Sequence, residues 1–233
     1  MNKINVYYKI HSLKEVKNII NKILDLIYPQ VCGICGKINT NSLCNKCEIK
    51  LKKHFEIKID NYEDFSTYYD KHIYFFQYEG SIRKLLINYK FNEKSYLYRS
   101  FVNFLLKQQK VFEIIKTYDI ILPVPISKKR YKQRGYNQTE LIAREISKRA
   151  GIELVTNCVY KERNNVPQST LNKEDRIENV KNTYIIKNSK IIKDKRAIIL
   201  DDIYTTGSTV NECSKLLKQN NVKEILVMTI AKD

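Results

Sequence analysis

The chain has 233 residues, 43% of them hydrophobic, which is enough to bury one full α/β core and carry a small appendage. No apolar run reaches membrane-spanning length, and the polar N-terminus lacks a signal-peptide core, so we expect a cytoplasmic protein without membrane insertion. The formal net charge of +17 would attract nucleic acid or anionic lipid, but abundant Lys, Asn, Ile and Tyr also indicate AT-rich coding bias, so charge alone decides little.

The first predicted element is an amphipathic helix over residues 13–27. It begins at the capping box formed by Ser12 and Glu15 and ends before Pro29. Its apolar residues recur at helical spacing, which is typical of a helix docked on protein rather than on a membrane.

Four cysteines follow in two matched pairs, Cys32 with Cys35 and Cys44 with Cys47. Two residues between thiolates allow a tight turn that presents both sulfurs to one metal and directs backbone N–H groups toward them. Four ligands leave no open coordination position, so we predict a structural Zn2+ site rather than a catalytic one. A redox pair or a disulfide is the alternative.

Residues 50–70 are charged and aromatic without a clear period, and we interpret them as a connection. Residues 1–70 then form an N-terminal region, and residues 71–233 form the main domain. In that domain strand and helix patterns alternate, which predicts a parallel sheet flanked by helices. The predicted strands are 73–78, 118–122, 154–160, 183–187, 197–200 and 224–230, and the predicted helices are 81–89, 96–112, 139–150 and 210–219.

The most informative segment is residues 197–209. Four apolar residues predict a central strand that ends at Asp201 and Asp202, where ligands of open α/β sheets bind. The next residues offer backbone N–H groups, hydroxyls, a glycine and a helix N-terminus, which suit an anion. They are Thr205, Thr206, Gly207, Ser208 and Thr209. Carboxylates that accept from a diol, next to a phosphate loop, predict a ribose 5-phosphate site; the alternative is a plain strand, turn and helix with polar caps.

This segment resembles the phosphoribosyl pyrophosphate (PRPP) motif of type I phosphoribosyltransferases, which is an apolar run, two acids and Thr-Thr-Gly-Ser-Thr. The resemblance implies an α/β fold of that type. It also implies that Asp201 and Asp202 are catalytic residues that orient the ribose, that residues 205–209 hold the 5-phosphate, and that Mg2+ binds together with PRPP.

A second site is predicted after the strand at 118–122. Pro123, Val124 and Pro125 rigidify the exit of that strand, and five cations occupy the seven positions 128–134. We expect this loop to bind the leaving pyrophosphate, with Lys128, Arg130 and Arg134 neutralising its charge. The alternative is a basic, solvent-exposed loop.

Several motifs together resemble the ComF family of competence-associated, phosphoribosyltransferase-like proteins. They are residues 26–29 before the cysteines, Tyr78-Glu79-Gly80, residues 123–125, Arg134-Gly135-Tyr136-Asn137-Gln138 and the PRPP motif. A polar stretch with Gln168 and Arg176 resembles the lid loop that closes over PRPP in type I enzymes; the alternative is a plain surface loop and short helix.

The resemblance implies a phosphoribosyltransferase that uses PRPP and an unknown nitrogen acceptor, linked to competence and DNA uptake. One alternative is a non-catalytic accessory factor that binds single-stranded DNA and keeps the PRPP site as a sensor. Another is an interaction module that joins competence proteins.

Overall fold

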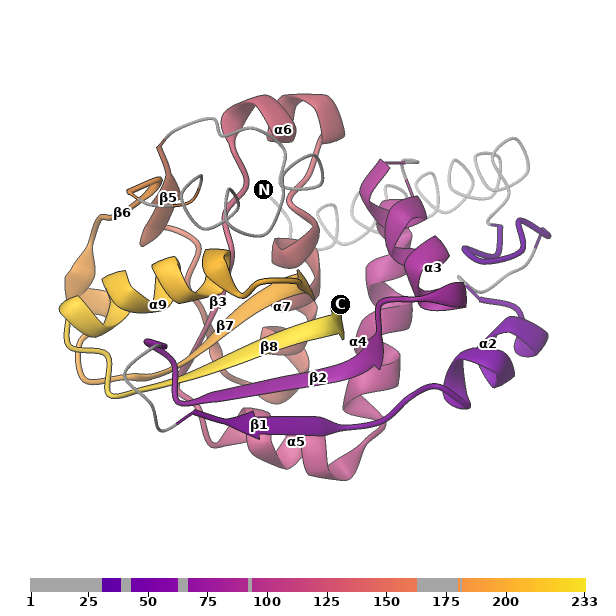
Figure 1. Ribbon diagram of the computed structural model, residues 1–233, viewed down its shortest axis with the longest axis horizontal. Coiled ribbons are helices and arrows are strands. Elements are labelled where there is room, and N and C mark those ends of the chain that lie inside the picture. Colours follow the sequence, from indigo (N-terminus) through magenta and orange to yellow (C-terminus); the bar gives the residue numbers. More distant parts are fainter. Residues whose placement is uncertain (1–30, 39–42, 63–66, 92–93, 163–179, 181) are drawn as a thin grey trace, which may run out of the picture.

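A mostly parallel sheet forms the centre of the computed structural model, which describes residues 31–38, 43–62, 67–91, 94–162, 180 and 182–233 (Figure 1). Six described strands pair in the order β1 (Lys58–Asn61), β2 (Lys71–Gln77), β8 (Glu224–Lys232), β7 (Arg196–Tyr204), β3 (Ile120–Pro123) and β4 (Glu153–Leu154). Only β1 among them pairs antiparallel. β5 (Val159–Lys161) and β6 (Tyr184–Ile186) form a separate antiparallel pair.

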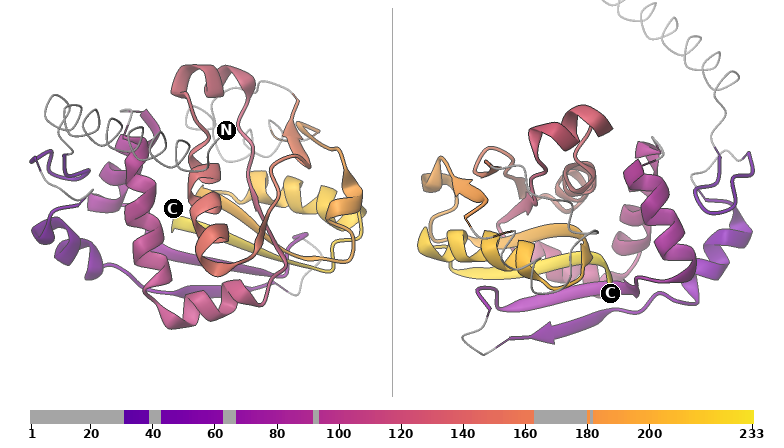
Figure 2. Two further views of the ribbon diagram at one scale, coloured as in Figure 1. Left: turned by 180° about the vertical axis from the view of Figure 1, so that it is seen from behind. Right: turned by 45° about the horizontal axis from the view of Figure 1, so that its top comes forward.

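Helices cover both faces of the sheet (Figure 2). Each face has its own apolar cluster. One face carries α3 (Gly80–Phe91), α4 (Tyr98–Leu106), α5 (Gln109–Lys116) and α7 (Gln138–Ala150). The other face carries α9 (Ser208–Gln219) together with β5 and β6. Among the described residues, the remaining helical elements are α2 (Asn45–Lys52), α6 (Lys128–Arg134) and the short 3-10 turns η1 (Ser95–Leu97) and η3 (Ser189–Ile191).

The predicted α/β class and the central strands are confirmed. Ala197, Ile198, Ile199 and Leu200 are all buried and alternate between the two clusters, as expected for a strand covered on both faces. The helices predicted at 81–89, 139–150 and 210–219 correspond to α3, α7 and α9.

Three predicted elements are wrong. The single helix expected over 96–112 is broken, because Gln108 is extended between α4 and α5. The single strand expected over 154–160 is instead divided between β4, which pairs with β3 in the main sheet, and β5. The strand expected at 183–187 corresponds to β6, which pairs with β5 outside the main sheet. The segment interpreted as a connection contributes edge strand β1, whose four residues are too short to show a pattern.

Strand β7 also continues past its predicted end. Its pairing with β3 stops at Leu200, opposite Pro123, but its pairing with β8 continues to Tyr204. The N–H of Val124 donates to the Leu200 carbonyl at 2.9 Å as β3 turns away. Asp201 and Asp202 therefore lie on the part of β7 that pairs with β8 alone among the described strands.

The cysteine turns pack on the main core rather than forming a separate body. Cys32 and Cys47 belong to the same apolar cluster as α3 and α4. A Cβ at Gly33 would lie 2.5 Å from a Leu97 methyl, so the turn approaches η1 more closely than any side chain would permit. The Tyr96 hydroxyl donates to the Val31 carbonyl at 2.8 Å.

The helix predicted over residues 13–27 lies outside the described residues. Within the described part of the chain, no helix has both the length and the apolar character needed to cross a bilayer.

Candidate functional site

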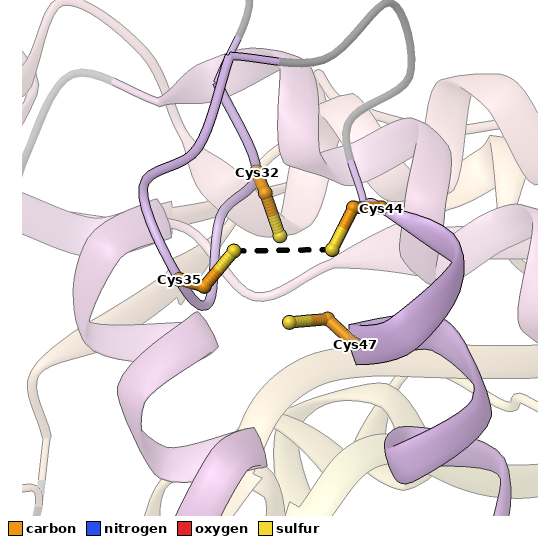
Figure 3. Close-up of side chains that lie close together, drawn as sticks. All are labelled: Cys32, Cys35, Cys44 and Cys47. Atoms are coloured by element: carbon orange, nitrogen blue, oxygen red, sulfur yellow. Dashed lines mark hydrogen bonds between the residues drawn. The ribbon is translucent and has the colours of Figure 1, made fainter.

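The four predicted metal ligands converge on one point. The sulfurs of Cys32, Cys35, Cys44 and Cys47 all lie within 4.8 Å of one another, and those of Cys35 and Cys44 are 3.8 Å apart (Figure 3). A tetrahedron with Zn–S bonds of about 2.3 Å has S···S edges of about 3.8 Å, whereas a disulfide needs about 2 Å. The cluster could therefore hold a tetrahedral metal such as zinc, and its spacing does not fit a disulfide.

The surroundings of the sulfurs also suit a cation. Burial raises the pKa of the Cys32 thiol, but backbone N–H groups of Cys35, Cys44 and Ile34 outweigh burial and lower it to about 6. Burial, followed by the neighbouring thiols, raises the pKa of Cys47 to about 12. Several thiolates this close require a positive charge between them, which a bound metal would provide.

The two predicted carboxylates face opposite sides of the sheet. Asp202 is 4% exposed and forms an ion pair with α3, which covers one face. Asp201 interacts with Lys161 of β5 and Cys213 of α9, which cover the other face. Successive residues of a strand alternate in this way, so the pair does not form one joint acidic site.

Asp202 is fully engaged by neighbouring side chains. Lys90 Nζ lies 2.9 Å from its Oδ1, and Gln138 Nε2 donates to its Oδ2 at 2.9 Å. The Gln138 Oε1 in turn accepts a hydrogen bond from Arg134 Nη1. A charge-assisted chain of side chains thus links Asp202 to the basic segment after β3.

The Arg-Gly-Tyr-Asn-Gln motif connects this basic segment to the sheet. Asn137 caps α7 by accepting from the Thr139 N–H at 3.2 Å. Asn137 Nδ2 and the Thr139 hydroxyl both donate to the Val124 carbonyl, at 3.1 and 2.9 Å. The start of α7 is therefore fixed against the Pro-Val-Pro exit of β3.

Asp201 lies beside a second group of polar residues. Its pKa is raised to about 7, mainly by burial and then by Asp202, although Lys90 opposes the shift. Lys161 Nζ donates to the Tyr184 hydroxyl at 3.4 Å. Burial lowers the pKa of Lys161, and the nearby positive charge of Arg130 in α6 lowers it further. This face therefore holds a carboxyl group, Asp201, whose pKa lies near 7, with Lys161 and Arg130 nearby.

The predicted phosphate loop is a tight turn between β7 and α9. Gly207 has φ +72 and is the N-cap of α9, so the first N–H groups of this 12-residue helix begin at Ser208. The hydroxyls of Thr206 and Ser208 lie 2.9 Å apart, and the Thr209 hydroxyl interacts with Tyr184. The turn and Asp201 therefore border the same Tyr184 side chain.

The basic segment differs from the predicted loop. It forms helix α6, which is capped by the Ser127 hydroxyl and has no buried residue. Arg134 is linked to Asp202 through Gln138, Arg130 lies near Lys161, and Lys128 is exposed at the start of the helix. Gln168 and Arg176 lie outside the described residues.

Four residues of this site were not expected from the sequence, namely Lys90, Gln138, Lys161 and Tyr184. Gln138 was visible in the Arg-Gly-Tyr-Asn-Gln motif, but nothing in the sequence showed that it contacts Asp202. Lys90 is one of many lysines at the end of a helix, and only the packing of α3 places it at the site.

Comparisons with known proteins identify the family to which this chain is similar. Residues 137–233 match the family described as Phosphoribosyl transferase domain. Competence protein F of Haemophilus influenzae is 30% identical over 207 residues, covering 87% of this chain and 90% of that protein. DNA utilization protein YhgH of Escherichia coli (strain K12) is 23% identical over 209 residues, covering 87% and 90%.

Among solved structures, a crystal structure of adenine phosphoribosyltransferase aligns with 79% of this chain and 89% of its own, at 17% identity and a TM-score of 0.38. The α/β sheet and the domain match define a type I phosphoribosyltransferase-like protein. With a relative 30% identical over most of both chains, the chain belongs to the ComF family of competence proteins.

Proposed function

We propose that the chain binds PRPP with Mg2+ and transfers its phosphoribosyl group to a nitrogen acceptor, in a process linked to DNA uptake. The main support is that Asp201, the turn at 205–209 and the contacts from Asp202 through Gln138 to Arg134 all lie at the carboxyl end of β7. Such an edge, beyond the carboxyl ends of parallel strands, is where ligands of this fold class bind. The two relatives named for competence and DNA utilization support the biological setting.

In this proposal each part of the site binds one part of PRPP. The N–H groups at the start of α9 hold the 5-phosphate, and Asp201 accepts from the ribose hydroxyls. Arg134 and Arg130 compensate the charge of the diphosphate as it leaves. Mg2+ takes oxygen ligands and keeps several waters, so PRPP oxygens would hold most of its shell, with the Asp201 carboxylate the protein group suited to contribute.

Calorimetric titration with Mg2+ and PRPP tests the binding step. We expect saturable binding by the intact chain and a loss of about tenfold or more in Asp201→Asn, because an amide cannot replace the carboxylate. Glu153→Gln, an exposed change on β4, is the matched control and should bind like the original chain. A flat titration of the intact chain would remove the proposal. Release of pyrophosphate in the presence of candidate nitrogen acceptors then separates a transferase from a sensor.

A second function, binding of single-stranded DNA, is favoured by one surface. Phe91 and Tyr131 are 69% and 51% exposed, and Arg134 lies over the Phe91 ring at 5.4 Å. The exposed lysines of α6 flank Tyr131. Exposed aromatic rings among cations are typical of proteins that stack the bases of single strands.

Salt dependence and stacking test this second function. We expect binding of a single-stranded oligonucleotide to weaken steeply with salt and to fall about tenfold in Tyr131→Ala. Tyr160→Ala, which removes a 37% exposed ring on β5, is the control and should leave affinity unchanged. If both Tyr131 and Tyr160 prove neutral, the surface is not a DNA platform, and a protein-interaction module becomes the better explanation.

We also propose that the metal at the cysteine cluster is structural Zn2+. All four cysteines are ligand candidates, which leaves no position for a substrate, and two of them are buried in the main core. Elemental analysis should find about one zinc per chain.

A further inference from the structure

Gln138 lies between an acid and a base that do not contact each other directly. Its Nε2 donates to Asp202 Oδ2 at 2.9 Å, and its Oε1 accepts from Arg134 Nη1. The glutamine amide offers a donor to the carboxylate and an acceptor to the guanidinium at the same time, which a leucine, a lysine or an ionised glutamate of similar size cannot do. The contact therefore depends on the amide and not only on the volume of the residue.

The Gln138 side chain is held in one orientation. The residue is 6% exposed, and its backbone carbonyl accepts from the Tyr89 hydroxyl at 2.6 Å. Lys90 Nζ lies 2.9 Å from the other oxygen of Asp202, so side chains hold both carboxylate oxygens and orient the group beside the amide. A flipped amide would place its NH2 group against Arg134 and its oxygen against Asp202, which both contacts disfavour.

Within the described part of the chain, Arg134 is the cation of α6 whose side chain bonds to a buried residue. Helix α6 has no buried residue, whereas the Arg134 guanidinium bonds to Gln138 and lies over Phe91. Burial lowers the pKa of Arg134, and Asp202 partly restores it. Its charge is thus partly withdrawn from water, and a cation in that state attracts an incoming anion more strongly than a mobile surface lysine does.

We propose that Gln138 is a positioning residue that fixes Arg134 for the diphosphate of PRPP, with Asp202 as its internal anchor. This inference rests on the proposed function. It divides the acidic pair: Asp202 supports the basic side of the site, and Asp201 remains available to the ribose. Gln138 itself touches no ligand.

A double-mutant cycle with two ligands tests the inference. The variants are Gln138→Leu, Arg134→Gln and the double variant, each titrated with Mg2+ and PRPP and with ribose 5-phosphate, which lacks the diphosphate. We expect each single change to weaken PRPP by about tenfold, and the double variant to bind no more weakly than Arg134→Gln alone. Ribose 5-phosphate affinity should change less than about twofold. Additive losses, or an equal loss for ribose 5-phosphate, would overturn the inference.

Two further measurements support the test. One uses a variant that disturbs packing less, and the other needs no PRPP. Gln138→Asn keeps the amide but shortens its reach, so it should weaken PRPP in the same direction with less loss of packing. The rate at which phenylglyoxal modifies Arg134, read by mass spectrometry, should rise in Gln138→Leu, whereas the rate at exposed Arg99 should not change. An unchanged Arg134 rate contradicts the positioning role even if the intact chain ignores PRPP, which would separately contradict the proposed function.

Discussion

The Tyr204 side chain lies directly beneath Gly207. A Cβ at position 207 would lie 2.3 Å from the Tyr204 hydroxyl oxygen, which is far inside van der Waals contact. The ring cannot easily move away, because its hydroxyl bonds to that of Tyr69 at 2.8 Å and its face stacks on His72 at 4.3 Å. The glycine of the 205–209 turn is therefore required by packing as well as by its positive φ.

Gly207→Ala should destabilise the protein by more than the strain of a positive φ alone, because the new Cβ would also clash with Tyr204. We expect a loss of about 2–3 kcal/mol in the free energy of unfolding and weaker PRPP binding, since both strain and overpacking act. Gly151→Ala is the matched control: its φ is +74, but nothing lies within 4 Å of its Cβ position. Urea titrations of both variants measure the difference, and equal losses would show that Tyr204 yields.

Removal of the metal should destabilise the main domain and not only the cysteine turns. Cys32 and Cys47 pack in the cluster that includes α3 and α4, so we expect a chelator to lower Tm by about 10 °C or more. Cys44→Ser should lose the zinc, whereas Cys158→Ser, at a buried thiol outside the cluster, should retain it. Elemental analysis with calorimetric melting checks both points. A chelated chain that melts like the original would contradict the prediction.

Asp201 should make stability depend on pH. Burial and Asp202 raise its pKa from 3.8 to about 7, so the folded state holds the proton longer than the unfolded chain does. The free energy of unfolding therefore falls as pH rises between about 4 and 7, by at most about 1.4 kcal/mol per pH unit. Asp201→Asn should be more stable than the original chain at pH 8, and the two should converge near pH 4. Parallel curves in urea titrations across this range would be the contrary result.

Glu224 should contribute stability with the opposite pH dependence. Burial raises its pKa, but hydrogen bonds from Lys71, Arg196 and Tyr118 outweigh burial and lower it from 4.5 to about 2. This contribution is complete above pH 4.5 and disappears as pH falls toward 2. Glu224→Gln should therefore cost roughly 1–2 kcal/mol at pH 7 and much less at pH 3. The exposed change Glu153→Gln is the control, and a cost for Glu224→Gln that does not vary with pH would exclude this explanation.

The central part of the fold was predictable because its signals are local and strong. The apolar run at 197–200, the glycine after α7 and the paired cysteines each specify a structure through nearby residues. Edge strand β1 and the division between β4 and β5 were not predictable, because they depend on which distant strand offers an open edge.

The sequence indicated which segments lie next to each other at the candidate site, but not how their side chains pair. The segments 123–138 and 197–209 were selected correctly as neighbours, yet the opposite faces of Asp201 and Asp202 follow from the continuation of β7 to Tyr204. Lys90 reaches Asp202 only through the packing of α3, which no periodicity reveals.

Helix α3 contacts both the cysteine turn and the candidate ligand site. Asn88 donates to the Gly33 carbonyl in the first cysteine turn, and two residues later Lys90 pairs with Asp202. Helix α3 thus contacts the turn that carries the first two cysteines and also supplies the lysine that pairs with Asp202. If the thiols were oxidised or lost their metal, α3 would lose this contact at the cysteine turn. The ion pair between Lys90 and Asp202 would then change, although no residue near Asp202 had been altered.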